Sequence, residues 1–211
     1  MRIVILDYGI GNVQSIFNVL AKFDGVDIIL SDNHAEILNA DGLILPGVGA
    51  YKKAMEELHK RDLPQILTKY IAKRKPLLGI CLGMQLLFES SDEFGYTKGL
   101  GVIKGKVARI PHDGIEKLPH IGWNSVSRHS VDWRDTLFKD IEDKDDFYFV
   151  HSFFCEPVEE GIITSKTFYS GVDFCSSIQK DSIYGFQFHP EKSSISGIKL
   201  IKNFVDVVES S

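Results

Sequence analysis

The most constraining feature of the sequence is a set of short segments that are apolar along nearly their whole length. They are RIVILD (2–7), VDIIL (26–30), GLILPG (42–47) and PLLGIC (76–81), and none shows the alternation of polar and apolar residues that marks a half-exposed strand. A strand that is apolar on both faces has to be covered by helices on both faces. The pattern therefore predicts a parallel α/β sheet.

Longer segments with apolar residues at helical spacing alternate with these strands: 12–23, 51–73 with a break near Pro64, and 82–90 after the last of them. Beyond about residue 100 the pattern changes to shorter strands joined by hairpins, followed by an amphipathic helix over 196–209. These strands are predicted at 99–110, 120–126, 146–154, 161–169 and 174–188, the last with a tight turn at 180–182. We therefore expect one domain over residues 1–211, an α/β fold with a mostly parallel central sheet and additional antiparallel strands in its C-terminal half.

Composition and charge exclude several functional classes. The chain carries 24 Lys and Arg against 29 Asp and Glu, and a formal net charge of −5 gives no reason to expect nucleic-acid binding. The most apolar segment, LLGICLGMQLLF, is too short for a membrane span, and the N-terminus lacks the features of a signal peptide. Cys81, Cys155 and Cys175 form no CxxC pair, and no ligand spacing predicts a metal or an organic cofactor. We expect a cytoplasmic protein with reduced thiols.

Cys81 stands where a strand gives way to a helix, and Gly79 and Gly83 flank it in the order G-I-C-L-G. This is the nucleophile-elbow pattern with cysteine in place of serine, in which side chains at the flanking positions would collide with neighbouring backbone. Ligands of open α/β sheets bind at this edge, and the N-terminus of the following helix favours a thiolate there. The alternative is a small apolar side chain packed in the core.

A thiolate nucleophile needs a base and a group that orients the base. The segment IYGFQFHPEKSS places His189 and Glu191 two residues apart at the end of a predicted strand, so both side chains are expected on the same side, and Pro190 ends the strand. The alternative is an incidental pair at a strand end. The remaining histidines lie in contexts that do not suggest a catalytic base: His34, His59, His112, His120, His129 and His151.

Two glycine-containing loops are candidates for binding loops. In LPGVGAY, Pro46, Gly47 and Gly49 stand between a strand and a helix, where free backbone N–H groups are able to face a developing oxyanion. The alternative is a plain strand-to-helix turn. In DYGIGN, Gln14 occupies the place of the third glycine of a G-x-G-x-x-G motif, so we reject a dinucleotide site there.

In this order, the pieces resemble the class-I, triad-type glutamine amidotransferase family, which has a flavodoxin-like three-layer fold. Within this family, six segments are similar to the glutaminase subunits of imidazole-glycerol-phosphate synthase: DYGIGNVQSI, LPGVGAYKKAM, GICLGMQLLFE, PHIGWN, YFVHS and GFQFHPEKS. Together they span nearly the whole chain. The resemblance implies hydrolysis of L-glutamine to glutamate and ammonia through a thioester, without a metal or cofactor.

The resemblance also implies a role for each matching residue. Cys81 would be the nucleophile, His189 the general base and then the acid for the leaving ammonia, and Glu191 the group that orients His189. The backbone N–H groups of Leu82 and of the Val48–Gly49 segment would form the oxyanion hole. The residues expected to hold glutamine, the last three largely through their main chain, are Gln85, Glu93, His151, Ser152 and Phe153.

The family's partner is a (β/α)8-barrel cyclase, which forms a heterodimer with the glutaminase and receives its ammonia. The cyclase makes imidazole glycerol phosphate and aminoimidazole carboxamide ribotide (AICAR) in histidine biosynthesis. The resemblance places Asn12, Trp123, Tyr148 and Lys192 at the interface. Their alternative roles are a helix cap for Asn12, core aromatics for Trp123 and Tyr148, and a solvated lysine for Lys192.

Some positions depart from the family pattern. Phe153, Phe154 and Cys155 replace the more usual tyrosines and small aliphatic residue, and Gln14 replaces a common basic residue. The departures leave open a paralogue that supplies ammonia to a sugar amidotransferase in surface-polysaccharide biosynthesis. A catalytically silent module that only stabilises the barrel is disfavoured, because all three triad positions keep their residues.

Overall fold

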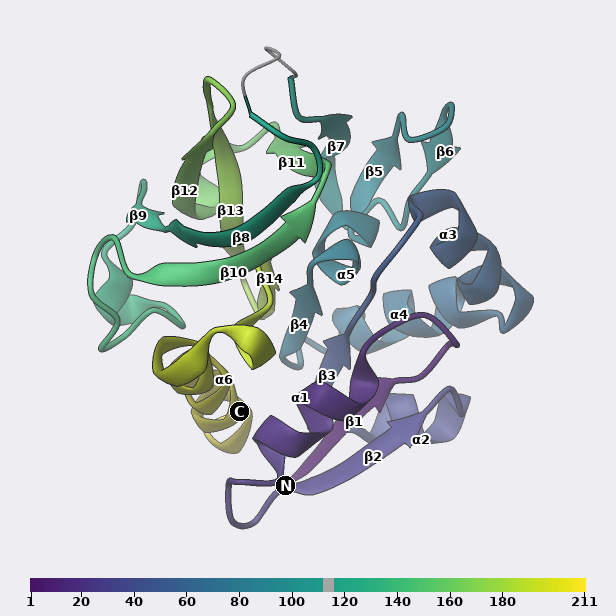
Figure 1. The fold of residues 1–211 in the computed structure, drawn as a ribbon. Coiled ribbons are helices and arrows are strands. Elements are labelled where there is room, and N and C mark those ends of the chain that lie inside the picture. The colour runs from purple at the N-terminus through teal and green to yellow at the C-terminus, as the bar shows by residue number, and fades with distance from the viewer. Residues whose placement is uncertain (112–115) are drawn as a thin grey trace.

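The computed structural model describes residues 1–111 and 116–211, so His112, one of the histidines given no catalytic role above, lies outside the described residues. In the described chain, a large sheet has strands in the order β2-β1-β3-β4-β14-β13-β11-β7-β5-β6, and a separate ribbon pairs β10 with β8 (Figure 1). Helices cover both faces of the parallel part of the sheet, as the apolar strands predicted.

The parallel half of the sheet comprises β1 (Arg2–Leu6), β2 (Asp27–Ser31), β3 (Gly42–Leu45), β4 (Leu77–Ile80) and β14 (Ile183–Phe186). β1 pairs in parallel with β2 and β3, β3 with β4, and β4 with β14. Because β14 comes from the far end of the sequence, its pairing with β4 brings the segments that follow the two strands to the same edge of the sheet.

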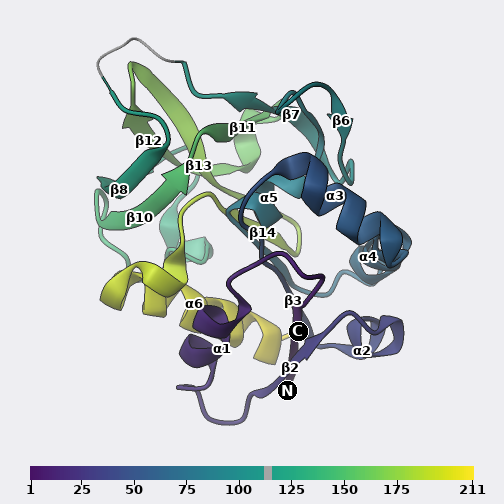
Figure 2. The same cartoon turned by 45° about the vertical axis from the view of Figure 1, so that its right-hand side comes forward.

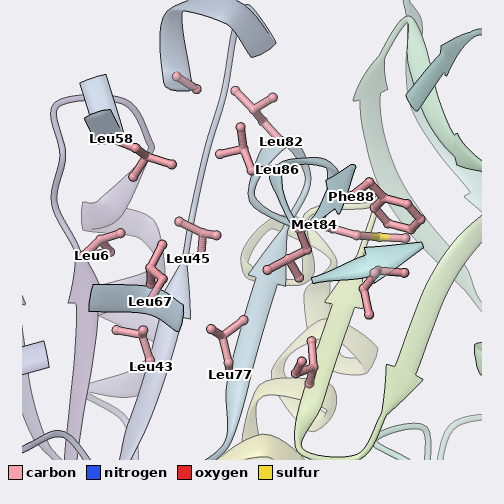
Figure 3. Close-up of a cluster of buried hydrophobic side chains, with 14 of the residues drawn as sticks. Leu6, Leu43, Leu45, Leu58, Leu67, Leu77, Leu82, Met84, Leu86 and Phe88 are labelled. Carbon is pink, nitrogen blue, oxygen red and sulfur yellow. The ribbon is translucent and has the colours of Figure 1, made fainter. Parts of the chain in front are cut away.

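Two apolar layers enclose this half of the sheet. α1 (Val13–Leu20) and α6 (Ser194–Glu209) lie on one face, and α2 (His34–Asn39), α3 (Tyr51–Lys60) and α4 (Leu63–Ala72) lie on the other (Figure 2). Alternate side chains of β1 enter the two clusters of buried residues. Figure 3 shows the cluster under α3 and α4, where strand leucines meet helix leucines (Leu6, Leu43, Leu45 and Leu77 with Leu58 and Leu67).

The second half of the chain extends the same sheet and adds the ribbon. The sheet continues in antiparallel pairs through β13 (Val172–Lys180), β11 (Phe153–Pro157) and β7 (Ile103–Arg109). Its edge is formed by β5 (Phe88–Ser91) and β6 (Thr97–Lys98). In addition, β12 (Ile163–Tyr169) pairs with β13 and with β9 (Ser127–Arg128). The ribbon consists of β8 (His120–Ser125) and β10 (Asp146–His151). The short 3-10 turns are η1 (Trp133–Asp135), η2 (Glu160–Ile162) and η3 (Pro190–Lys192). The antiparallel C-terminal half is thus confirmed.

Several boundaries differ from the prediction. The helix expected over 82–90 is only α5 (Leu82–Leu86), since the chain re-enters the sheet as β5. The strand expected over 146–154 is interrupted at Ser152 and becomes β10 and β11, which belong to different sheets. The break near Pro64 lies at Asp62, whose φ is 54°, and Pro64 itself fits in the first turn of α4. The predicted helices did not include α2, a six-residue helix capped by Asn33. No helix in residues 1–111 or 116–211 is long and apolar enough to cross a membrane.

Candidate active site

Main-chain hydrogen bonds at the end of β4 and β14 hold Cys81 near His189. The backbone N–H of Cys81 donates to the carbonyl of Phe186 (2.7 Å), the last residue of β14. Three residues later, the N–H of His189 donates to the carbonyl of Tyr148 in β10 (2.9 Å). Cys81 is 5% exposed and His189 2% exposed. The predicted nucleophile and base therefore share one buried edge of the sheet.

Cys81 occupies a strained turn between β4 and α5. Its φ of 54° and ψ of −113° are rare for a residue with a side chain. A Cβ atom at Gly83 would lie 1.8 Å from the Leu45 carbonyl oxygen, and one at Gly79 would lie 2.8 Å from the Cα of Met84. The steric reason given for the two flanking glycines is confirmed. A small apolar side chain in a core needs no such strained backbone, so the geometry favours the elbow.

His189 and Glu191 are in direct contact. The Nδ1–H of His189 donates to Oε1 of Glu191 (2.8 Å), and the Glu191 side chain is 1% exposed. The reason given from the sequence was wrong: β14 ends at Phe186, and Pro190–Lys192 form the 3-10 turn η3 rather than a strand end. It is this turn that brings the carboxylate beside the imidazole. Nε2 of His189 makes no hydrogen bond within the described residues, so it is available on the side away from Glu191.

The charge environment keeps His189 protonated. Burial by itself lowers its pKa, but interactions with the Cys81 sulfur and the Glu191 carboxylate outweigh burial and raise the pKa to about 10. The raised pKa favours the imidazolium form, with the Glu191 carboxylate on the Nδ1 side. This is the arrangement in which a cysteine serves as a thiolate nucleophile.

The P-G-V-G loop packs against the elbow. A Cβ atom at Gly47 would lie 2.9 Å from the Cβ of Leu82 and 3.0 Å from the backbone nitrogen of Gly83. Gly49 has a φ of 92°, which favours glycine. The backbone N–H groups of Val48, Gly49 and Leu82 donate to no acceptor within the described residues. The loop thus leaves donors free beside Cys81, as an oxyanion site requires.

A cavity of about 620 Å³ opens in front of Cys81. It is lined by the residues predicted from the sequence to form the oxyanion hole and to hold the substrate: Val48, Gly49, Leu82, Gln85, Glu93, His151, Ser152 and Phe153. Five further lining residues were not predicted: Asp92, Phe94, Arg109, Pro119 and Val150. Arg109 ends β7, and its register partner is Phe153 in β11, so its place in the cavity follows from a pairing the sequence does not display.

Gln85 links the cavity to Cys81 through Gln187, a residue that the sequence interpretation missed. Nε2 of Gln85 donates to the Phe153 carbonyl (2.9 Å) and to Oε1 of Gln187 (3.0 Å). Nε2 of Gln187 in turn lies 3.7 Å from the Cys81 sulfur as a donor. Gln187 is fully buried. Its only signal in the sequence is a polar residue inside the apolar run GFQF.

The cavity carries opposite charges. Glu93 accepts a hydrogen bond from the Tyr51 N–H through Oε2 (2.6 Å), which fixes the carboxylate at the start of α3. Asp92 and the guanidinium-bearing Arg109 line the same cavity. Such a set suits a ligand with both an ammonium and a carboxylate group, because each finds a counter-charge. No group of three or more His, Cys, Asp and Glu side chains is arranged to hold a metal within the described ranges.

Three of the four predicted interface residues lie together outside the cavity. Trp123 and Tyr148 are cross-strand partners in the β8–β10 ribbon, with ring centroids 6.2 Å apart, and Nζ of Lys192 lies 5.7 Å from the Tyr148 ring centroid. Trp123 is 53% exposed, which excludes the alternative of a core aromatic. Asn12 occupies the N-cap position of α1, yet its side chain makes no capping hydrogen bond.

Comparison with known proteins identifies the family. The family model described as "Glutamine amidotransferase class-I" matches residues 4–208. The chain belongs to this family. The chain is also 46% identical over 208 residues (99% of this chain, 97% of the relative) to a protein of Listeria innocua named imidazole glycerol phosphate synthase subunit HisH. It is 41% identical over 206 residues to the protein of that name from Chlorobaculum tepidum (97% and 99%).

Another relative and two solved structures agree with this class-I glutamine amidotransferase assignment. The chain is 45% identical over 210 residues to imidazole glycerol phosphate synthase subunit HisH 2 of Vibrio vulnificus (99% of this chain, 96% of the relative). A glutamine amidotransferase structure superposes with a TM-score of 0.74 at 14% identity (98% of each chain), and PurLQS from Thermotoga maritima with 0.72 at 16% (97% of each). At these identities the structures show the fold alone, and the predicted class-I glutamine amidotransferase fold is confirmed.

Proposed function

We propose that this protein is the glutaminase subunit of an imidazole-glycerol-phosphate synthase, with residues 1–211 forming one glutamine amidotransferase domain. It would hydrolyse L-glutamine to glutamate and ammonia at Cys81. The observation that carries the proposal is the buried array of Cys81, His189 and Glu191 at one sheet edge, opening into a cavity with free backbone N–H donors. Relatives that match over nearly their full length bear this subunit's name.

The reaction follows from the array. The Cys81 thiolate attacks the side-chain amide carbon of glutamine, and the N–H groups of Val48, Gly49 and Leu82 stabilise the resulting oxyanion. The His189 imidazolium, oriented by Glu191, gives its proton to the amide nitrogen, and ammonia leaves as the thioester forms. His189 then takes a proton from water, which attacks the thioester and releases glutamate and the Cys81 thiolate.

The cavity supports glutamine as the substrate. Its acidic and basic side chains, Glu93 and Arg109, are placed to face the ammonium and carboxylate of an amino acid. The amide group would point toward Cys81, next to the loop that carries Gly49. Ligand cavities of several hundred Å³ are ordinary for small molecules, and a space of about 620 Å³ has room for an amino acid such as glutamine.

The partner in this proposal is the (β/α)8-barrel cyclase, in a cytoplasmic heterodimer. The exposed Trp123, paired with Tyr148 and next to Lys192, provides an aromatic and basic patch that suits a protein interface. Cys81, Cys155 and Cys175 are all free, in keeping with a reducing compartment. A sugar amidotransferase partner is the alternative, and it would leave the chemistry at Cys81 unchanged.

The test is glutamate release from L-glutamine by the protein alone and mixed with the barrel cyclase of the same genome, charged with its ribonucleotide substrate. We expect strong stimulation that Cys81→Ala abolishes, while ammonia-dependent synthesis by the cyclase survives the substitution. Glutamate release unaffected by Cys81→Ala would contradict the glutaminase assignment. Cys81-dependent release that the cyclase leaves unchanged would retain the glutaminase and point to the sugar-amidating partner.

A further inference from the structure

A buried histidine pair adjoins the cavity: His151 lines it and His120 lies beyond His151, and neither belongs to the array of Cys81, His189 and Glu191. Nδ1 of His151 lies 2.9 Å from the Phe153 carbonyl oxygen, and Nε2 of His151 lies 3.1 Å from Nδ1 of His120. Nε2 of His120 lies 3.4 Å from the side-chain amide nitrogen of Asn124. The Phe153 carbonyl is the same acceptor that Gln85 uses. The Phe153 carbonyl at the cavity wall thus accepts hydrogen bonds from both the His151 ring and the Gln85 side-chain amide.

These contacts fix where each proton lies. The side-chain nitrogen of Asn124 donates to the Phe168 carbonyl (3.0 Å) and its side-chain oxygen accepts from the Ser125 N–H (2.8 Å), so Nε2 of His120 faces an NH2 donor and accepts. Nδ1 of His120 then carries the hydrogen and donates to Nε2 of His151, and Nδ1 of His151 donates to the Phe153 carbonyl, which only accepts. Both histidines are consequently neutral Nδ1–H tautomers. A second proton on His151 would set two N–H groups against each other and break the contact with His120.

The surroundings enforce this neutral state. The His120 ring is stacked between Phe149 and Tyr169, with ring centroids 4.9 Å and 3.8 Å away, and Phe174 packs edge-on against both histidines. Burial lowers the pKa of His120 to about 4. Burial and the charges of His120 and His189 lower the pKa of His151 to about 3. Among the described residues, the titratable groups that face the pair are each other, Tyr169 and, toward His151, His189.

The remaining links lead to the nucleophile. Gln85 joins the Phe153 carbonyl to Gln187, and Gln187 donates toward the Cys81 sulfur. Each of these side chains is buried. Among the described residues, the Phe153 carbonyl is the acceptor that the histidine pair and the glutamine pair share, so its position couples the two pairs.

We propose that His120 is a positioning residue for the reaction at Cys81: through His151 it holds the Phe153 carbonyl, and with it Gln85 and Gln187, in the arrangement that orients the sulfur and shapes the cavity wall. His120 touches neither the cavity nor Cys81, so it acts only through this chain of hydrogen bonds. The inference rests on the proposed glutaminase function, because glutamine is the molecule this wall would contact.

Two substitutions separate the hydrogen bond of His120 from its packing. His120→Phe keeps a ring between Phe149 and Tyr169 but has no N–H donor. His120→Asn loses the ring but keeps an N–H donor close to the place of Nδ1. If the hydrogen bond matters, kcat/KM for glutamine falls about tenfold in His120→Phe, the effect of one lost buried hydrogen bond, while its melting temperature falls less than that of His120→Asn because the ring packing is kept. His120→Asn then melts lower and yet retains more of the activity.

The reverse order, with activity following melting temperature in the two variants, would overturn the proposal and leave His120 a packing residue. A measurement without glutamine accompanies the kinetics: the rate at which iodoacetamide alkylates Cys81, followed on the Cys81 peptide by mass spectrometry. We expect a changed rate in His120→Phe and a near-wild-type rate in His120→Asn. Equal rates in His120→Phe and wild type, with equal kcat/KM, would also overturn it.

Failure of the proposed function has a different signature. If the wild type and Cys81→Ala release glutamate equally, the glutaminase assignment falls, whereas the alkylation rates still test the role of His120. The wild-type protein provides a further test that needs no folded variant. In 15N NMR of histidine-labelled protein at neutral pH, both His120 and His151 should carry the hydrogen on Nδ1. An Nε2–H tautomer or a doubly protonated ring at either position would contradict the proposed chain.

Discussion

The hydroxyl of Tyr8 donates a hydrogen bond to the carbonyl of Pro46 (2.8 Å), so the loop after β1 anchors the P-G-V-G loop. Tyr8 is fully buried, and a Cβ atom at Gly47 would lie 3.0 Å from its hydroxyl oxygen. The N–H groups of Val48 and Gly49 follow directly in the chain. The contact therefore links a residue from the first strand-to-helix turn to the proposed oxyanion donors.

Tyr8→Phe should reduce kcat for glutamine more than it changes KM, by about tenfold, because the loop that presents the oxyanion donors loses an anchor. The free energy of unfolding should fall by about 1–2 kcal/mol, since the Pro46 carbonyl loses a buried donor. Tyr70→Phe is the matched control: its hydroxyl donates to the Pro76 carbonyl (3.0 Å), far along the chain from the loop. It should destabilise the protein similarly and leave kcat unchanged. Equal kcat losses in the two variants would remove the special role of Tyr8.

The elbow gives a steric prediction. Gly83→Ala would place a methyl group 1.8 Å from the Leu45 carbonyl oxygen, so β3 and α5 would have to move apart. We expect a loss of about 3 kcal/mol or more in the free energy of unfolding, measured by urea denaturation, or no folded protein at all. Gly161→Ala serves as the control, because a Cβ atom there meets nothing within 4 Å. A folded Gly83→Ala protein with wild-type stability would show that the elbow is looser than the structure describes.

The local parts of this site were predictable from the sequence. The elbow around Cys81 and the P-G-V-G loop depend on glycines and an apolar run within a few residues, and both patterns can be recognised in the amino-acid sequence. The contact of His189 with Glu191 was predicted for the wrong reason, since a 3-10 turn and not strand spacing produces it. Both an extended strand and a 3-10 turn can bring the side chains of residues i and i+2 close together, and the sequence H-P-E does not distinguish the two.

The parts that were missed depend on pairing between distant segments. His120 meets His151 because they are register partners in the β8–β10 ribbon, and Gln187 reaches Gln85 across 102 positions of sequence. One signal was present in β8: on one face His120 is buried and Asn124 half-buried, while the apolar Ile121 and Trp123 on the other are 59% and 53% exposed. A strand with its polar residues inside and apolar residues outside indicates both a buried polar network and a covered outer face.

Glu191→Gln tests the charge that maintains the His189 imidazolium. The amide still accepts from Nδ1 but carries no charge, so the pKa of His189, now about 10, should fall. Glutamine turnover should decrease by a factor on the order of 10² to 10⁴, and the alkaline limb of the kcat/KM profile should move to lower pH. Glu160→Gln is the matched control: it changes another His–Glu contact, with His129 (3.0 Å), on the exposed surface. Its pH profile should be that of the wild type, and a shift as large as in Glu191→Gln would mean that general electrostatics, not the buried contact, sets the profile.

The neutral histidine pair predicts a loss of stability in acid. The unfolded chain binds a proton on each histidine below about pH 6.5, whereas folded His120 and His151 stay neutral until about pH 4 and about pH 3. Between these limits the unfolded state binds more protons, so the free energy of unfolding falls as the pH decreases from 6.5 toward 4. Each histidine contributes a slope of up to about 1.4 kcal/mol per pH unit. Urea denaturation at pH 7.5, 6.0 and 5.0 measures it.

His120→Phe should remove the contribution of one of the two histidines from this slope, since the phenylalanine does not titrate. His59→Phe, which removes an exposed imidazole from α3, is the control for the general loss of a histidine. The comparison isolates burial as the cause, because both variants lose the same titrating group and differ in where it stands. His120→Phe and the wild type could instead lose stability equally between pH 7.5 and 5.0. His120 would then titrate in the folded protein as it does in the unfolded chain, which would contradict a neutral His120–His151 pair.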